Sequence, residues 1–129
     1  MDTEKINTTA LAYIGDSIYE VYIREHVMRQ GAVHVDMLHK EAVKFTSAKG
    51  QALAIKKIFD TLSEEEQAFV KRARNHKSQS RSKNAGPVEY KWATALEALI
   101  GKLHLEENIS REKEIIESAV SIIQGEYNG

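Results

Sequence analysis

The chain has 129 residues and a formal net charge of −1, with 42% hydrophobic residues and no cysteine. This length suits one domain with one core, and this apolar content excludes a disordered chain. The lack of cysteine excludes disulfide bonds, thiolate metal sites and cysteine nucleophiles. We therefore expect a single globular domain over residues 1–129.

The N-terminal residues lack the basic and then apolar pattern of a secretory signal peptide. No apolar run in the chain approaches the roughly 20 residues that a membrane-spanning helix needs. We therefore expect a cytoplasmic protein without a membrane partner.

The small net charge hides an uneven distribution. The segment from Lys71 to Lys91 holds seven basic residues and a single acid, Glu89, for a net charge of +6. The remainder of the chain holds 11 basic and 18 acidic residues, a net charge of −7. A concentrated basic segment of this kind indicates a nucleic-acid partner even when the whole chain is nearly neutral.

Helical periodicity dominates the sequence, and proline occurs once. The first predicted helix runs from about Thr8 to Met28, with Thr8 or Thr9 as its N-cap, and Gly31 ends it. Its predicted buried stripe consists of Leu11, Ile14, Ile18 and Val21.

A long helical region is predicted from about 35 to 59, with a bend near Thr46-Ser47 and Gly50 because glycine is a poor helix former. A shorter helix begins at Ser63 and fades near residue 74. Glu66 lies three residues after Ser63, which is the capping-box pattern.

Residues 75–88 are predicted to form a loop, which at this length is usually functional or disordered. The next predicted helix runs from about Glu89 to Leu105, and a last helix, capped by Ser110, runs through Ile123 and ends at Gly125. The sequence therefore predicts an all-α helical bundle.

Two mostly apolar helical segments each carry one acid beside glycine or alanine. Asp16 lies in the segment 11–17 and Glu97 in the segment 94–101. Either acid alone would more often be a solvated surface residue, because an acid buried without a partner costs free energy. The two together indicate carboxylates that the fold brings side by side to hold a divalent cation.

These segments resemble the two signatures of the ribonuclease III catalytic domain. The family signature Leu-Glu-Phe-Leu-Gly-Asp corresponds to residues 11–16, where Ala12 replaces the glutamate. The second signature, Asp-x-x-Glu-Ala, corresponds to residues 94–98, where Thr94 replaces the aspartate. The short Mini-III form of the family is similar to this chain in keeping only the acids at Asp16 and Glu97.

The resemblance to Mini-III ribonucleases extends over nearly the whole chain, including residues 72–78, 83–84 and 97–103. It implies a dimeric ribonuclease III-like endonuclease domain without a separate double-stranded-RNA-binding domain. The implied activity is cleavage of double-stranded RNA to 5′-phosphate and 3′-hydroxyl ends, in the maturation of 23S ribosomal RNA precursors. The homodimer is implied to form through Tyr13, which occupies the position of the signature aromatic residue.

The resemblance assigns Asp16 and Glu97 as the catalytic and metal-binding residues. Magnesium, or manganese in its place, is compatible with so few ligands because Mg²⁺ keeps several waters and takes further oxygens from substrate phosphates. Such an ion activates a water and stabilises the leaving oxygen. The number of ions stays open, as does the role of Glu20, which either compensates for Ala12 or is a surface acid.

The basic segment leads directly into the helix that carries Glu97, so RNA bound there would lie near the metal. Double-stranded RNA is read by shape, phosphates and 2′-hydroxyls, which lysine and arginine suit. The alternative is a solvated connector. The predicted RNA-binding residues are Arg72, Arg74, His76, Lys77, Arg81 and Lys83.

Two other functions remain open at this point. The absence of two family carboxylates would also fit a non-catalytic ribonuclease III-like RNA-binding or ribosome-assembly protein, although the retained Asp16 and Glu97 argue against it. A helical metal phosphohydrolase of small nucleotides is disfavoured by the basic segment and by the lack of histidines at metal-ligand spacing.

Overall fold

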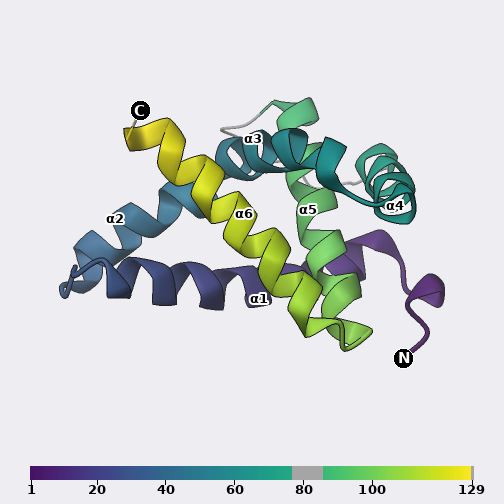
Figure 1. The fold of residues 1–129 in the computed structure, drawn as a ribbon, viewed down its shortest axis with the longest axis horizontal. Helices are drawn as coiled ribbons and strands as arrows, with labels where there is room; N and C mark the ends of the chain where they lie inside the picture. The colour runs from purple at the N-terminus through teal and green to yellow at the C-terminus, as the bar shows by residue number, and fades with distance from the viewer. Residues whose placement is uncertain (77–85, 129) are drawn as a thin grey trace.

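The computed structural model of the chain describes residues 1–76 and 86–128, and every regular element in that part is helical (Figure 1). The predicted all-α fold is confirmed. Two short 3₁₀ helices, η1 (Thr3–Lys5) and η2 (Phe59–Thr61), accompany the α-helices. The described α-helices are α1 (Thr8–Arg29), α2 (Val35–Thr46), α3 (Ala48–Ile58), α4 (Glu64–Asn75), α5 (Pro87–Leu105) and α6 (Ile109–Asn128).

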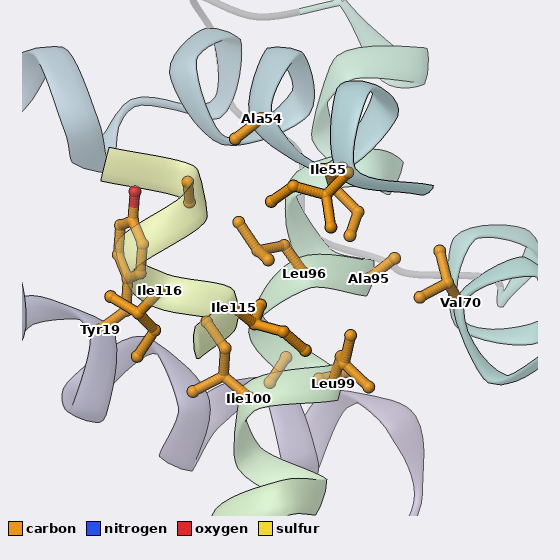
Figure 2. Packing of buried hydrophobic residues seen from close by; sticks show 14 of the residues in the cluster. Tyr19, Ala54, Ile55, Val70, Ala95, Leu96, Leu99, Ile100, Ile115 and Ile116 are labelled. Atoms are coloured by element: carbon orange, nitrogen blue, oxygen red, sulfur yellow. The ribbon is translucent and has the colours of Figure 1, made fainter. Parts of the chain in front are cut away.

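Helix α5 is the centre of the bundle and packs against α1, α3, α4 and α6. In Figure 1, α1 lies along the bottom of the molecule and α6 crosses in front of it. Leu96, Leu99 and Ile100 of α5 are fully buried and meet Ile115 and Ile116 of α6 in the core (Figure 2). The helix that carries Glu97 is therefore held on several sides.

The crossing of α1 and α5 is unusually close, because each helix presents a glycine to the other. A Cβ atom on Gly15 would overlap the backbone carbonyl oxygen of Glu97, and one on Gly101 would overlap the carbonyl oxygen of Leu11. Glycine at these two positions leaves room for the neighbouring backbone. The two backbones touch at the level of the acidic residues.

The predicted buried stripe of α1 is wrong in part. Val21 is 56% exposed, and Ile14 and Ile18 are only half-buried. Hydrophobicity alone missed the buried face because that face includes a glycine at the crossing and a tyrosine whose hydroxyl donates to the carbonyl of Phe45 at 2.7 Å. The buried residues at four-residue spacing are Leu11, Gly15, Tyr19, Ile23 and Val27.

Helix α1 begins at the predicted residue, Thr8, but neither of the predicted N-caps, Thr8 and Thr9, is the cap. Asn7 is the N-cap, and its side-chain oxygen accepts from the backbone N–H of Ala10 at 2.8 Å. At the other end α1 stops at Arg29, and Gly31 follows with a φ of +102°, which confirms the predicted stop.

The predicted bend near residue 47 is a complete break between two helices. Ser47 has an extended backbone and caps α3, accepting from the N–H of Gly50 at 3.1 Å. The capping box predicted for α4 is confirmed, with Ser63 and Glu66 bonding each other's backbone N–H groups.

The last two helices differ from their predicted limits. Helix α5 starts at Pro87 rather than Glu89, since proline suits the first helical position. Asn108 rather than Ser110 caps α6, its side chain accepting from the N–H of Arg111 at 3.3 Å, and α6 continues through Gly125. Of the predicted loop, residues 77–85 lie outside the described part. None of the described helices is long and apolar enough to cross a membrane.

Candidate catalytic and metal site

The glycine crossing places the side chains of Asp16 and Glu97 against each other. Asp16 lies on α1 directly after Gly15, and Glu97 lies one turn before Gly101 on α5. The Asp16 carboxyl group lies near enough to the Glu97 carboxyl group to raise its pKa. Two acids that are 81 positions apart in the sequence therefore share one place in the fold.

The surroundings of Glu97 disfavour its charged form. Burial raises the pKa of Glu97 to about 8, and the neighbouring Asp16 adds to the shift by hydrogen bonding and by charge repulsion. The amide of Gln51 acts in the opposite direction. Two carboxylates this close repel each other when both are ionised, and a divalent cation between them would relieve the repulsion.

Gln51 and Tyr19 also belong to this environment, and sequence reasoning missed them. The Nε2 of Gln51 donates to Oε2 of Glu97 at 3.5 Å. Burial, and then the charges of Glu97 and Glu20, hold the pKa of Tyr19 well above its usual range. The available signal for Gln51 was a polar residue on the apolar stripe of α3 that also holds Ile55 and Ile58.

Glu20 lies one turn after Asp16 on α1 and is partly exposed. Its Oε2 is buried and makes no hydrogen bond within the described residues, and the nearest cation, Nε of Arg24, is 3.7 Å away. At the positions of the two absent family carboxylates, Ala12 is buried and the Thr94 hydroxyl donates to the carbonyl of Tyr90 at 2.9 Å. Neither position supplies a ligand-like oxygen aimed at the acid pair.

The donor set fits a hard divalent cation. Residues 1–76 and 86–128 contain no group of three or more His, Cys, Asp or Glu side chains that could hold a metal. The paired carboxylates of Asp16 and Glu97 are oxygen ligands of the kind that Mg²⁺ and Mn²⁺ prefer, and Mg²⁺ is commonly held by one or two carboxylates with water and phosphate completing the shell. One turn further along α1, Oε2 of Glu20 is buried, with Nε of Arg24 at 3.7 Å.

The predicted RNA-binding residues fall partly within the described structure. Arg72 and Arg74 lie in the last turn of α4 and His76 directly follows it. The guanidinium of Arg74 lies 4.8 Å from the ring centroid of Trp92 on α5. The other three predicted residues, Lys77, Arg81 and Lys83, lie outside the described part.

Tyr13, the predicted dimer residue, is 81% exposed on α1. It follows the buried Ala12 and precedes the half-buried Ile14, so its ring points away from the core of this chain. No partner chain is part of the structure, so the dimer stays a prediction.

Residues 9–108 match the ribonuclease III domain, a stretch that includes both acids and both glycines of the crossing. The chain belongs to the ribonuclease III family and is an endoribonuclease, and the alternative of a non-catalytic relative is not favoured. Enzymes of this family act on RNA and depend on a metal.

Within the family, the chain is similar to proteins of the short form. It is 43% identical to Mini-ribonuclease 3 of Thermoanaerobacter sp., over 92% of this chain and 84% of that protein. It is 43% identical to Mini-ribonuclease 3 of Brevibacillus brevis, over 97% of this chain and 93% of that protein. A crystal structure of a Fusobacterium nucleatum protein superposes with a TM-score of 0.81 at 37% identity, covering 97% and 98% of the two chains.

Proposed function

We propose that this endoribonuclease cleaves double-stranded RNA at the Asp16–Glu97 pair with the help of a divalent cation. The observation that carries the proposal is the meeting of the two carboxyl groups at the α1–α5 crossing. The relatives named Mini-ribonuclease 3 support the assignment.

Asp16 and Glu97 would hold the cation, with Mg²⁺ as the preferred ion and Mn²⁺ as a substitute. When bound, such an ion supplies an activated water and neutralises charge on the scissile phosphate. The chain itself fixes where the two carboxylates meet, because no side chain separates α1 from α5 at the crossing. A ligand pair fixed in this way does not have to be assembled when RNA arrives.

Glu20 is proposed to assist through water rather than as a direct ligand, because it lies one turn from Asp16 and its buried Oε2 makes no hydrogen bond within the described residues, with only the ion pair to Arg24 beside it. Glu20→Gln would then weaken Mn²⁺ binding by a smaller factor than Asp16→Asn. Binding equal to that of the wild type would remove Glu20 from the site.

The RNA surface is proposed to include the basic segment and the cations of the helices beside it. Within residues 1–76 and 86–128, no lysine or arginine of α3 or α4 forms an ion pair with an acid. Lys56, Lys71 and Arg74 lie over the rings of Trp92 or Phe59, but no acid in the described part of the chain neutralises their charge. Cations without an acidic partner attract phosphates. The cations in question are Lys49, Lys56 and Lys57 of α3 and Lys71, Arg72 and Arg74 of α4.

The active form is proposed to be a symmetric homodimer through the face that bears Tyr13. A large aromatic side chain exposed to 81% is costly to leave in water and is a frequent anchor of interfaces. Two symmetric sites would allow a paired cut, one in each strand of a duplex.

The physiological substrate is proposed to be a precursor of 23S ribosomal RNA, processed in the cytoplasm. The support is the likeness to the Mini-III relatives, since the surface described above recognises phosphates and carries no base-specific information.

The proposed function is tested by incubating purified protein with labelled duplex RNA and with single-stranded RNA of the same sequence. Cleavage of the duplex in Mg²⁺ or Mn²⁺, and its loss with chelator, is the expected result. Binding of duplex without cleavage in either metal, or equal cleavage of the single strand, would contradict the proposal.

A further inference from the structure

Gln51 is one of the few polar side chains in the described core. It is 2% exposed and shares its helix face with the buried Ile55 and Ile58. An amide placed among apolar residues costs free energy unless it is hydrogen-bonded. In the described part of the chain, the side chain of Gln51 makes one recorded hydrogen bond, from Nε2 to Oε2 of Glu97 at 3.5 Å.

The break between α2 and α3 fixes where Gln51 lies. Ser47 caps α3, and Gly50 packs against the backbone so closely that a Cβ there would overlap the carbonyl oxygen of Lys44. Gln51 is the next residue. Its position therefore depends on a backbone corner rather than on a flexible surface segment.

An amide beside a carboxylate has two effects that an acid or an apolar residue lacks. Its N–H group favours the charged form of the acid, and the contact restricts the directions in which the carboxylate can turn. Because the amide has no charge, it adds nothing to the repulsion between Asp16 and Glu97. Groups that orient metal ligands in this way affect metal affinity by about 10- to 100-fold.

We propose that Gln51 is a positioning residue, which holds the Glu97 carboxylate in the orientation that binds the divalent cation together with Asp16. This inference rests on the proposed function. Gln51 contacts only Oε2 of Glu97, at 3.5 Å. The carboxyl group that it contacts is the one that Asp16 also acts on.

The test is Mn²⁺ binding to the full chain without RNA, measured by electron paramagnetic resonance of free Mn²⁺ and by calorimetry. Gln51→Met keeps the length of the side chain and removes the N–H donor. The expected result is folded protein with about tenfold weaker Mn²⁺ binding. Cleavage of duplex RNA should fall at low Mn²⁺ and recover as Mn²⁺ is raised, which a purely structural defect would not do.

Gln67→Met is the matched control. Gln67 also donates to an oxygen inside the chain, the carbonyl of Phe59 at 2.9 Å, but that contact lies away from the acid pair. This variant should bind Mn²⁺ as the wild type does.

Gln51→Glu supplies a second variant should Gln51→Met be unstable. It keeps the shape and adds a third carboxylate, so the metal-free protein should melt at a lower temperature than the wild type. Added Mn²⁺ should then raise the melting temperature by more than it does in the wild type, because the cation offsets a larger repulsion.

Wild-type Mn²⁺ affinity in Gln51→Met, or an unchanged response of Gln51→Glu to Mn²⁺, would overturn the role of Gln51. The metal site itself has a separate readout. If Asp16→Asn binds Mn²⁺ as tightly as the wild type, the proposed function fails at this site, and the role of Gln51 fails with it.

Discussion

Helices α1 and α6 differ from helices α3 and α4 in whether their lysines and arginines form ion pairs. Every lysine and arginine of α1 and α6 forms an ion pair with an acid: Arg24, Arg29, Arg111 and Lys113. In the described part of the chain, the six cations of α3 and α4 form none. In Figure 1, α3 lies at the top of the view and α4 at its right, whereas α1 runs along the bottom.

This difference separates cations that stabilise the fold from cations that remain available to a polyanion. Arg111 of α6 donates to both oxygens of Glu66 on α4, at 2.8 and 2.9 Å, and so ties two helices together. Cations without acidic partners contribute little to stability but raise the local potential. The candidate catalytic acids lie at the crossing of α1 and α5, where Gln51 of α3 contacts Glu97.

The largest effect is expected for the two acids, which should be needed for cleavage but not for duplex binding. Asp16→Asn and Glu97→Gln should each lower the single-turnover cleavage rate by on the order of 10⁴-fold, a scale seen when a catalytic group is removed. Duplex binding and the dimer should be retained, because the cations lie elsewhere. A rate near that of the wild type in either variant, measured with enzyme in excess, would remove that residue from the mechanism.

The second prediction tests the unpaired region. Replacement of Lys49, Lys57 and Arg72 with alanine should weaken duplex binding roughly 100-fold, to a similar extent for unrelated sequences. The slope of log affinity against log salt should flatten by about one for each lost phosphate contact.

The matched control replaces Arg24, Arg29 and Lys113, which are paired in the fold. This triple variant should bind duplex RNA much as the wild type does. Equal losses in the two triple variants would show that ion pairing does not distinguish the two regions.

The third prediction concerns the exposed aromatic residue of α1. Tyr13→Asp should weaken self-association about 30-fold, the loss expected for a central aromatic anchor. Sedimentation at several concentrations measures the association. If the variant associates as the wild type does, or if a monomeric wild type cleaves at full rate, the proposed dimer face is wrong.

The smallest effect concerns stability in the paired region. The hydrogen bonds from Arg111 hold the pKa of Glu66 below its usual value. Because this pKa is lowered on folding, the pair stabilises the protein above the unfolded pKa, and the stabilisation is lost as the pH falls through the folded pKa. Arg111→Met should therefore cost about 1 kcal/mol near pH 7, discounted for partial exposure, and little at pH 3.

Urea unfolding of Arg111→Met and the wild type at the two pH values measures this difference. RNA affinity should not change, since Arg111 belongs to the paired region. A stability loss that is the same at pH 7 and pH 3 would mean that packing rather than charge accounts for it.

The helices, the capping box and a bend after Thr46 could be predicted because local chemistry decides them, although the bend is a complete break. Ser63 and Glu66 satisfy each other's backbone groups within one turn, whatever the remainder of the chain does. The buried face of α1 could not be predicted from hydrophobicity. Gly15 and Tyr19 are buried only because α5 and the end of α2 lie against them.

The candidate site shows the same division. Asp16 and Glu97 could be predicted as site residues because each lies in a recognisable segment, and the resemblance pairs the two segments. Gln51 belongs to a third helix, and nothing in the sequence near either acid points to it. Its partner is known only once α3 is packed against α5. Long-range polar contacts of this kind depend on the tertiary fold.

The glycine crossing has a consequence for how mutations in this protein will be read. A methyl group at Gly15 or Gly101 would meet the opposite backbone and push the two helices apart. In a screen for activity, each glycine would therefore score as severely as a residue that takes part in the reaction, although neither contributes a functional group. A loss of activity at these two positions would report the short distance between the two helix backbones. It would not show that either glycine takes part in the reaction.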